Sequence, residues 1–394
     1  MVYPYAMTER ATPLTERTQT RQSLLNAVEK IRDVIAGSAD ESERAATLAP
    51  AAVAALDDSG LLKLKLPAVL GGAEADPVTQ IEVIEALSAI DATAGWCLMV
   101  GATTLALPGV YLGDAAVGKI FGGGKTPRAA GCYMPTGTAE PAHGGYRISG
   151  RWAFASGIRH ADWVSGTARV RGSERRVFVI PVGDVEIHDN WQVAGLRGTG
   201  SCDFSVHDRF VPEAFTWDHE SAVPRRGGAL YRLGWPAFVA NEHAAFALGV
   251  ARRALDEVSR MATSKARGMA PTLLAERPAF QRFVGAAEMR LAAARALAIE
   301  VNAAAWETVS AGGRLTPRRQ AELRAASVHV SDVCLELVTS AFRYAGGSAV
   351  YDASVLQRCL RDLAAGGQHF MVSDTGYEAL GQFVLGIPGA EPMR

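Results

Sequence analysis

Residues 144–163 read GGYRISGRWAFASGIRHADW, and this stretch decides the fold of the chain. Two glycines mark a turn at its start, and large apolar residues at positions 146, 148, 152 and 154 then alternate with small or polar ones. A period of two is typical of a β-strand, and Ser156-Gly157 ends the pattern. We therefore expect a strand over residues 146–155 that brings two aromatic side chains close to the Ser156 hydroxyl.

The end of this strand has the groups that a planar, redox-active ring system needs. Trp152 offers a surface for the ring, Ser156 offers a hydroxyl for its edge, and Gly157 allows the backbone to approach closely. The alternative is purely structural, because aromatic residues in strands usually pack in a core and Ser-Gly often forms only a turn. Both interpretations remain open on this stretch alone.

Composition indicates a globular protein with two or three domains. The chain is 48% apolar and 21% charged, and its 40 basic and 41 acidic residues nearly cancel. A balanced, interspersed charge predicts no nucleic-acid groove and no membrane surface, so we expect small molecules or further copies of the chain as partners. The uncharged run at 96–113 contains threonines and a proline, and we expect a buried helix and loop rather than a membrane span.

The five cysteines indicate a reducing compartment. They are odd in number, far apart and without metal-ligand spacing, so we expect no metal site and no disulfide framework. The first residues lack the pattern of a signal peptide. These features predict a cytoplasmic protein.

Three regions differ in their periodicity. Helical spacing dominates residues 1–126, short strands separated by turn residues fill 127–225, and helical spacing returns over 226–394. In the last region we expect helices over 238–263, 278–310, 317–344 and 354–385, the last with a break near Gly366-Gly367. The sequence thus predicts an N-terminal helical domain, a central antiparallel β domain and a C-terminal helical bundle.

This order of elements resembles the α+β fold of the acyl-CoA dehydrogenase superfamily, whose central domain is an antiparallel β-barrel or sandwich. Residues 191–201, WQVAGLRGTGS, followed by Phe210-Val211-Pro212, are similar to the second β-domain signature of that superfamily. In that signature a glycine-rich turn and its hydroxyl groups approach the flavin. The resemblance therefore implies that Thr199 and Ser201 lie at the cofactor. From the residues alone, a bulged strand with capped turns is the alternative.

The pattern G-R-W-x-F-x-S-G-x-x-H-A-x-W within residues 150–163 is similar to that of the two-component, reduced-flavin-dependent monooxygenases of this superfamily, the group D enzymes. A second resemblance follows Arg361-Asp362, where most dehydrogenases carry a catalytic glutamate and this chain has His369. The family implies that His369 lies over the reactive face of the flavin, close to Ser156. An imidazole there suits proton management or substrate activation near pH 7.

The resemblance implies an enzyme that uses reduced flavin and dioxygen, through a C4a-hydroperoxyflavin, to hydroxylate a small electron-rich aromatic compound such as a phenol or indole. It implies Ser156 and His369 as catalytic residues, with Ser156 near flavin N5, and Trp152 packed against the isoalloxazine. Gly157 belongs to the same cofactor contact. Trp96 and Glu242 are expected at the substrate pocket.

The family also implies how the rest of the cofactor is held. FAD is expected rather than FMN, with its tail crossing to a neighbouring subunit of a homotetramer. The matching positions here are Arg267 and the turn formed by Gly346, Gly347 and Ser348, whose guanidinium and backbone amides suit phosphate. No NAD(P)H fingerprint is visible, which implies a separate flavin reductase as partner.

Three other functions stay open. The same chemistry could oxygenate the nitrogen of an amine or amino sugar. Glu242, seven residues before Gly249, could be the relocated base of an acyl-CoA dehydrogenase. In a different class, the chain could be a non-catalytic flavin-binding scaffold.

Overall fold

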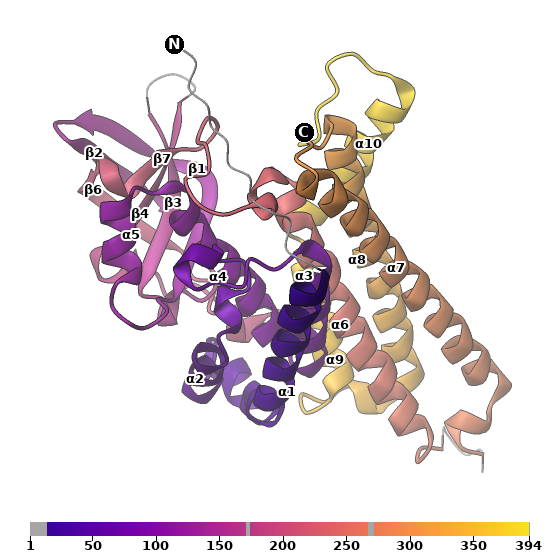
Figure 1. The fold of residues 1–394 in the computed structure, drawn as a ribbon. Coiled ribbons are helices and arrows are strands. Elements are labelled where there is room, and N and C mark those ends of the chain that lie inside the picture. The colour runs from indigo at the N-terminus through magenta and orange to yellow at the C-terminus, as the bar shows by residue number, and fades with distance from the viewer. Residues whose placement is uncertain (1–13, 171–173, 267–271, 394) are drawn as a thin grey trace.

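The computed structural model describes residues 14–170, 174–266 and 272–393, and Figure 1 shows how they are arranged. The helices, the sheet and the second set of helices follow one another as predicted. The first set comprises α1 (Leu14–Ala45), α2 (Pro50–Ser59), α3 (Pro77–Ile90), α4 (Ala92–Tyr111) and α5 (Asp114–Phe121).

Helix α4 is the central helix of the first region. Asp91 caps its start, since the Ala94 amide donates to the Asp91 carboxylate at 2.8 Å. Two helical stretches of the described chain, Ala92–Tyr111 and Pro317–Val350, are long and apolar enough to cross a membrane by length and composition. Because 89% of the apolar window of Ala92–Tyr111 is buried inside the protein, the prediction of a buried helix here is confirmed, although the helix continues through Pro108.

The central region is a seven-stranded sheet in the order β5-β6-β2-β1-β3-β4-β7. Most neighbours are antiparallel, but β1 and β3 pair in parallel, so the sheet is mixed rather than purely antiparallel as expected. The reason is the segment between β2 and β3, which crosses to the other side of β1 instead of forming a hairpin. The strands are β1 (Ala129–Ala142), β2 (Gly145–Trp152), β3 (Trp163–Arg169), β4 (Arg175–Pro181), β5 (Glu186–Ile187), β6 (Phe204–Pro212) and β7 (Thr216–Asp218).

The last region is a bundle of long helices, which extends away from the sheet (Figure 1). Its helices are α6 (Ala237–Ala262), α7 (Pro278–Ser310), α8 (Pro317–Ala345), α9 (Val355–Gly366) and α10 (Thr375–Leu385). The predicted break is confirmed, because α9 ends at Gly366 and the chain forms the short helix η10 (Phe370–Val372) before α10. Helix α6 packs against both α3 and α8 and so joins the bundle to the N-terminal helices.

Trp152 belongs to the core of the sheet and not to the flavin surface that we expected. Its side chain is 0% exposed, and its ring stacks on Phe204 at 5.2 Å between centroids and meets Phe178 edge-on at 5.0 Å. Its indole N–H donates to the Thr167 carbonyl at 2.8 Å. Strand β2 ends at Trp152, and a φ of +63° at Phe154 turns that ring outward, where it is 71% exposed. The prediction that Trp152 packs against the isoalloxazine is therefore wrong.

Truncation of Trp152 and truncation of Phe154 should have very different effects on the free energy of unfolding. Trp152→Ala removes a buried ring and should lower the free energy of unfolding by roughly 3–5 kcal/mol. Phe154→Ala removes an exposed ring and should change it by no more than about 0.5 kcal/mol. Urea denaturation of both variants measures the difference, and equal losses would contradict the placement of Trp152 in the core.

Candidate active site

Two of the sequence motifs meet just beyond the end of β2. The backbone amide of Gly157 donates to the carbonyl of Thr199 at 2.9 Å, and that of Ala155 donates to the carbonyl of Cys202 at 3.2 Å. Gly157 has a φ of +77°, and a Cβ there would lie 3.0 Å from Nε2 of His160, so only glycine fits without strain. The Ser156-Gly157 turn is thus held against the glycine-rich turn of residues 195–201.

A third motif, on helix α9, supports the same turn. The Leu196 amide donates to the Asp362 carboxylate at 2.7 Å, and Gly195 packs so closely that a Cβ would lie 2.0 Å from the Arg361 carbonyl oxygen. Asp362 is fully buried, and burial raises its pKa to about 7. This contact ties the sheet to the helix that leads into His369.

Trp96, on α4, connects the two predicted catalytic residues. Its indole N–H donates to the Ser156 hydroxyl at 3.1 Å, and its ring meets the ring of His369 edge-on at 6.0 Å between centroids. The ring of Phe246 lies against it at 5.1 Å. The structure thus brings Ser156, His369 and Trp96 together from three distant parts of the chain.

Thr199 and Ser201 lie on the interior side of Ser156 and not on the side where a cofactor would contact it. The Ser156 and Ser201 hydroxyl oxygens are 2.7 Å apart, those of Ser201 and Thr199 are 2.6 Å apart, and Thr199 donates to the Leu196 carbonyl at 2.8 Å. Thr199 is 0% and Ser201 3% exposed. The expectation that both approach a cofactor directly is corrected for Thr199, since it has no surface for a ligand, and both hydroxyls connect to the site through Ser156.

His369 presents a hydrogen-bond donor. Its Nδ1 accepts from the Met371 amide at 3.3 Å, which leaves the proton of the neutral ring on Nε2. Burial lowers its pKa from the ordinary 6.5 to about 4, so the imidazole is neutral at pH 7.

His243, on α6, is a site residue that the sequence motifs did not mark. Its ring stacks on His369 at 4.4 Å between centroids and lies edge-on to Trp96 at 5.6 Å. It is buried, and burial together with the nearby His369 lowers its pKa well below the ordinary range. Its Nδ1 has no hydrogen-bond partner within the described parts of the chain. No spacing or motif distinguishes this histidine in the sequence, because its role comes from its contacts across α4 and η10.

Glu242 is an interior residue, not a pocket residue. Its carboxylate accepts from Lys65 Nζ at 2.8 Å and from the Thr103 hydroxyl at 2.7 Å, and Lys65 also donates to the Phe238 carbonyl at 2.6 Å. Both charged side chains are buried; burial raises the pKa of Glu242 and lowers that of Lys65, and the ion pair opposes both shifts. The pair joins α4 and α6 to the segment before α3, so the structure does not present Glu242 as a free base.

Of the residues expected at the cofactor phosphates, those that the structure describes lie away from the Ser156–His369 site. Arg267 is outside the described residues. Gly346, Gly347 and Ser348 follow the end of α8, where Lys265 Nζ donates to the Ser348 hydroxyl and to the Ala345 carbonyl. Lys265 follows the end of α6, and the helix from His243 to that end spans about 28 Å at 1.5 Å per residue. One chain therefore does not bring this turn to its own Ser156–His369 site, and Lys265 is a cation there that the sequence motifs missed.

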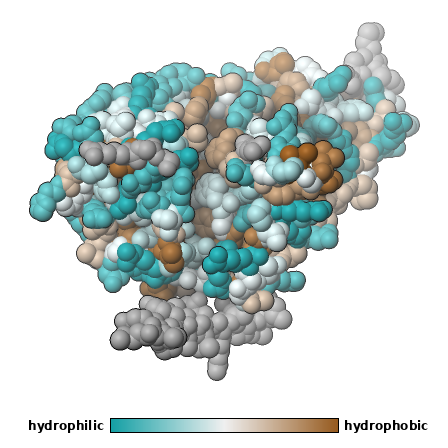
Figure 2. Space-filling view, turned by 90° about the horizontal axis from the view of Figure 1, so that it is seen from above, coloured by the Kyte–Doolittle hydropathy of each residue, from teal (hydrophilic) through white to brown (hydrophobic). Residues whose placement is uncertain are grey.

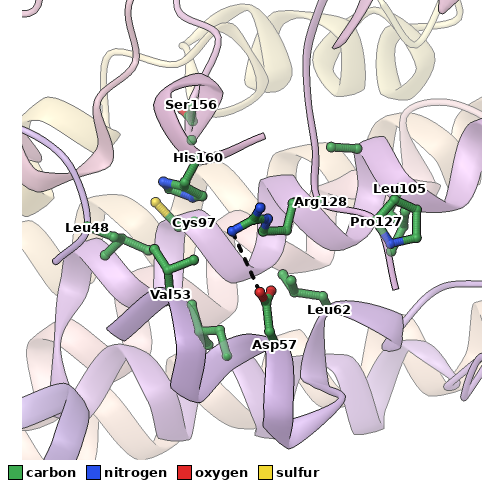
Figure 3. Close-up of a pocket in the computed structure, with 14 residues that line it drawn as sticks. Leu48, Val53, Asp57, Leu62, Cys97, Leu105, Pro127, Arg128, Ser156 and His160 are labelled. Carbon is green, nitrogen blue, oxygen red and sulfur yellow. Dashed lines mark ion pairs between the residues drawn. The ribbon is translucent and has the colours of Figure 1, made fainter. Parts of the chain in front are cut away.

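A small pocket lies on the other side of the Ser156-Gly157 turn (Figure 3). Apolar side chains of α2 and α4 line one wall, and His160, at the end of the short helix Ile158–His160, lies at the pocket together with Ser156 and Gly157 of the turn. Arg128 lies at the pocket with its guanidinium 3.0 Å from Asp162 and 3.7 Å from Asp57. Burial lowers the pKa of His160 to about 4, so this imidazole is also neutral.

The residues at this turn fit a flavin. The positive φ of Phe154 holds its large ring in solvent, where the ring lies edge-on to Trp191 at 6.1 Å between centroids. A bound ring system would cover the exposed apolar surface of Phe154. Ser156 offers a hydroxyl beside it. Residues 14–170, 174–266 and 272–393 contain no cluster of three or more His, Cys, Asp or Glu side chains that could hold a metal.

Breaking the buried ion pair should cost more than removing both charges. Glu242→Leu leaves Lys65 buried without its partner and should lower the free energy of unfolding by about 3–5 kcal/mol, whereas the double variant E242L/K65M should recover most of that loss. Urea denaturation measures both, and Glu257→Leu in the exposed Arg260 pair is the control. A single variant as stable as the double one would contradict the structural role.

The partly buried His369 and His160 should make the fold sensitive to acid. The pKa of His369 and of His160 is about 4 in the folded protein and near 6.5 in the unfolded chain, so the unfolded chain binds more protons between these values. The free energy of unfolding should therefore fall as pH falls from about 6.5 to about 4. His369→Asn should reduce this slope by up to about 1.4 kcal/mol per pH unit, measured by denaturation across the window. An unchanged slope would contradict a neutral imidazole at His369 with a lowered pKa, and His329→Asn, on an exposed face, is the control.

The sequence and the fold of this chain are similar to those of known proteins. The family model "Acyl-CoA dehydrogenase, N-terminal domain" matches residues 18–119, and "Acyl-CoA dehydrogenase, C-terminal domain" matches residues 242–374. The chain is 32% identical to the indole-3-acetate monooxygenase of Pseudomonas putida over 84% of this chain and 86% of the relative. It is 27% identical to the FADH2-dependent resorcinol hydroxylase, oxygenase component, of a Rhizobium species over 95% of this chain and 97% of the relative.

The solved structure of XiaF from Streptomyces, in complex with FADH2 and glycerol, has a TM-score of 0.87 and 25% identity, covering 96% of this chain and 99% of XiaF. The HsaA monooxygenase of Mycobacterium tuberculosis has a TM-score of 0.85 and 25% identity, and the match covers 95% of this chain and 100% of HsaA. The chain therefore belongs to the acyl-CoA dehydrogenase family and, within it, to the flavin-dependent monooxygenases.

Proposed function

We propose that this chain is the oxygenase component of a two-component system, which uses reduced flavin and dioxygen to hydroxylate a small, electron-rich aromatic compound. The observation that carries the proposal is the meeting of Ser156 and His369 on the indole of Trp96. A hydroxyl for the cofactor and an imidazole for the substrate are then held in one apolar site. The relatives support the reaction class, because their names describe hydroxylases of indole-like and phenolic compounds.

Reduced flavin, when bound, supplies two electrons and activates dioxygen, of which one atom enters the product and the other leaves as water. In this chain Ser156 would contact the edge of the flavin and Phe154 its face, while Gly157 provides the positive φ that shapes the turn. FAD is the proposed form, because the resorcinol hydroxylase is named for FADH2 and XiaF holds it. A neighbour that holds FMN, KijD3, shares the fold at 20% identity.

His369 would orient the substrate. Its Nε2–H can donate to an oxygen or nitrogen of the substrate. With the hydrogen on Nε2, this nitrogen cannot at the same time accept a proton from the substrate. The aromatic edges of Trp96, Phe246 and His243 exclude water and suit a planar ring. These contacts favour an aromatic substrate over an amino sugar.

The other functions receive less support. An acyl-CoA dehydrogenase needs a free carboxylate base, but Glu242 is bound to Lys65 and Thr103, and His369 stands at the usual base position. A non-catalytic scaffold would not need Ser156, Trp96 and His369 to converge.

A separate reductase and a homotetramer complete the proposal. The names of relatives, "oxygenase subunit" and "oxygenase component", support a reductase partner that delivers reduced flavin. A further copy of the chain would bring the Gly346–Ser348 turn, with Lys265, to the cofactor tail, which one chain alone does not do. Figure 2 shows a mostly hydrophilic face with small hydrophobic groups, and we propose a cytoplasmic location, in keeping with five free cysteines.

The reaction can be tested with isotopically labelled dioxygen. The full chain is mixed with FAD, a flavin reductase, NADH and one compound from a panel of indole-3-acetate, resorcinol, an alkylamine and an acyl-CoA thioester. We expect one labelled oxygen atom in an aromatic product, detected by mass spectrometry. Oxidation of the thioester without oxygen incorporation would overturn the proposal.

Replacement of His369 should separate chemistry from cofactor binding. His369→Ala should lower the rate of aromatic hydroxylation by at least about 100-fold, because the orienting and proton-holding group is lost. The dissociation constant of reduced FAD should change little, since Ser156 and Phe154 remain. Steady-state kinetics and anaerobic binding measure the two effects, and His329→Ala is the control. Full activity in the His369 variant would exclude its role.

A further inference from the structure

The hydroxyl groups behind Ser156 form a chain whose direction can be deduced. It runs from the Leu196 carbonyl through Thr199 and Ser201 to Ser156. Each hydroxyl has one hydrogen to donate and two lone pairs to accept with. Because every link joins two oxygens 2.6–2.8 Å apart, each link must hold one hydrogen.

The direction follows from the carbonyl end. The Leu196 oxygen carries no hydrogen, so Thr199 must donate to it. The hydrogen between Thr199 and Ser201 must then come from Ser201, and the hydrogen between Ser201 and Ser156 must come from Ser156. The single hydrogen of Ser156 therefore points inward, away from any ligand.

The other side of Ser156 is fixed by Trp96. The indole N–H can only donate, so it occupies one lone pair of the Ser156 oxygen at 3.1 Å. The Ser156 oxygen then has one free lone pair and no hydrogen that it could donate to a ligand. Burial of Thr199 and Ser201 keeps water from reversing the chain, since they are 0% and 3% exposed.

We propose that Thr199 and Ser201 are positioning residues that make Ser156 a hydrogen-bond acceptor toward the flavin, so that the site selects reduced over oxidised flavin. This inference rests on the proposed function and on the position near N5 of the flavin that the family resemblance implies for Ser156. N5 carries a hydrogen in reduced flavin and only a lone pair in oxidised flavin. A lone pair on Ser156 accepts from the first and repels the second, so the oxygenase would take up reduced flavin and release oxidised flavin.

The test compares the affinity of the full chain for the two forms of FAD. Oxidised FAD is titrated in air and reduced FAD under anaerobic conditions, each followed by ultrafiltration. We expect wild type to bind the reduced form at least about tenfold more tightly. Ser201→Ala frees the Ser156 hydrogen to turn toward the flavin, and this preference should fall by about tenfold. The midpoint potential of bound FAD should fall by about 30 mV, which is the same tenfold for a two-electron couple.

Two further variants separate direction from mere loss of a hydrogen bond. Thr199→Val removes the acceptor of Ser201, which can then donate to Ser156, so the preference should fall as in Ser201→Ala. Trp96→Phe removes a hydrogen bond to Ser156 but leaves its hydrogen committed to Ser201, so the preference should stay within a factor of about 3. Ser205→Ala, a buried serine of β6 that pairs with His188, is the control for folding.

The outcomes distinguish the two proposals. A wild-type chain that incorporates labelled oxygen and prefers reduced FAD, with an unchanged preference in both S201A and T199V, would overturn the directional chain and leave the proposed function standing. An equal loss of preference in W96F and S201A would also overturn it, because direction would then not matter. A wild-type chain that binds neither form of FAD would overturn both proposals.

Discussion

The indole of Trp96 is the contact on which the site depends. Its N–H holds the hydroxyl of Ser156 on the sheet, and its ring packs against His369 at the end of α9 and against His243 on α6. Helix α4 can place it there because Gly95 lets α4 lie directly on α3, where a Cβ would be 2.1 Å from the Ser88 hydroxyl oxygen. The three parts of the chain that carry function therefore meet on one buried side chain.

The interior around this contact is arranged to be neutral and dry. The two nearby histidines lose their protons through burial, and the buried charges of Lys65 and Glu242 pair with each other. A buried pair adds little to stability compared with apolar packing, but it is costly to break, so it fixes how α4 and α6 meet. Exclusion of water is the condition that oxygen activation by a flavin requires.

The same scaffold supports two chemistries, and few side chains separate them. A carboxylate above the flavin would suit removal of a proton from a thioester, whereas a neutral imidazole with its hydrogen on Nε2 suits binding of a polar atom on an aromatic ring. The hydroxyl chain behind Ser156 adds a selection by redox state without any charge. In this chain the proposed chemistry thus depends on which atoms hold hydrogens as well as on the fold.

The order of helices, sheet and helices and the break after Gly366 could be predicted from the chain, because they rest on local periodicity and on glycine. The family resemblance singled out Ser156 and His369, and the structure places both against the indole of Trp96. The surroundings of that pair could not be predicted. A strict alternation placed Trp152 and Phe154 alike, and only the positive φ of Phe154 separates a core ring from an exposed one. Glu242 and Lys65 are 177 residues apart, and His243 acts through contacts between helices. Such pairings, and the direction of the hydroxyl chain, arise only when distant segments pack, since burial decides which polar groups must find one another.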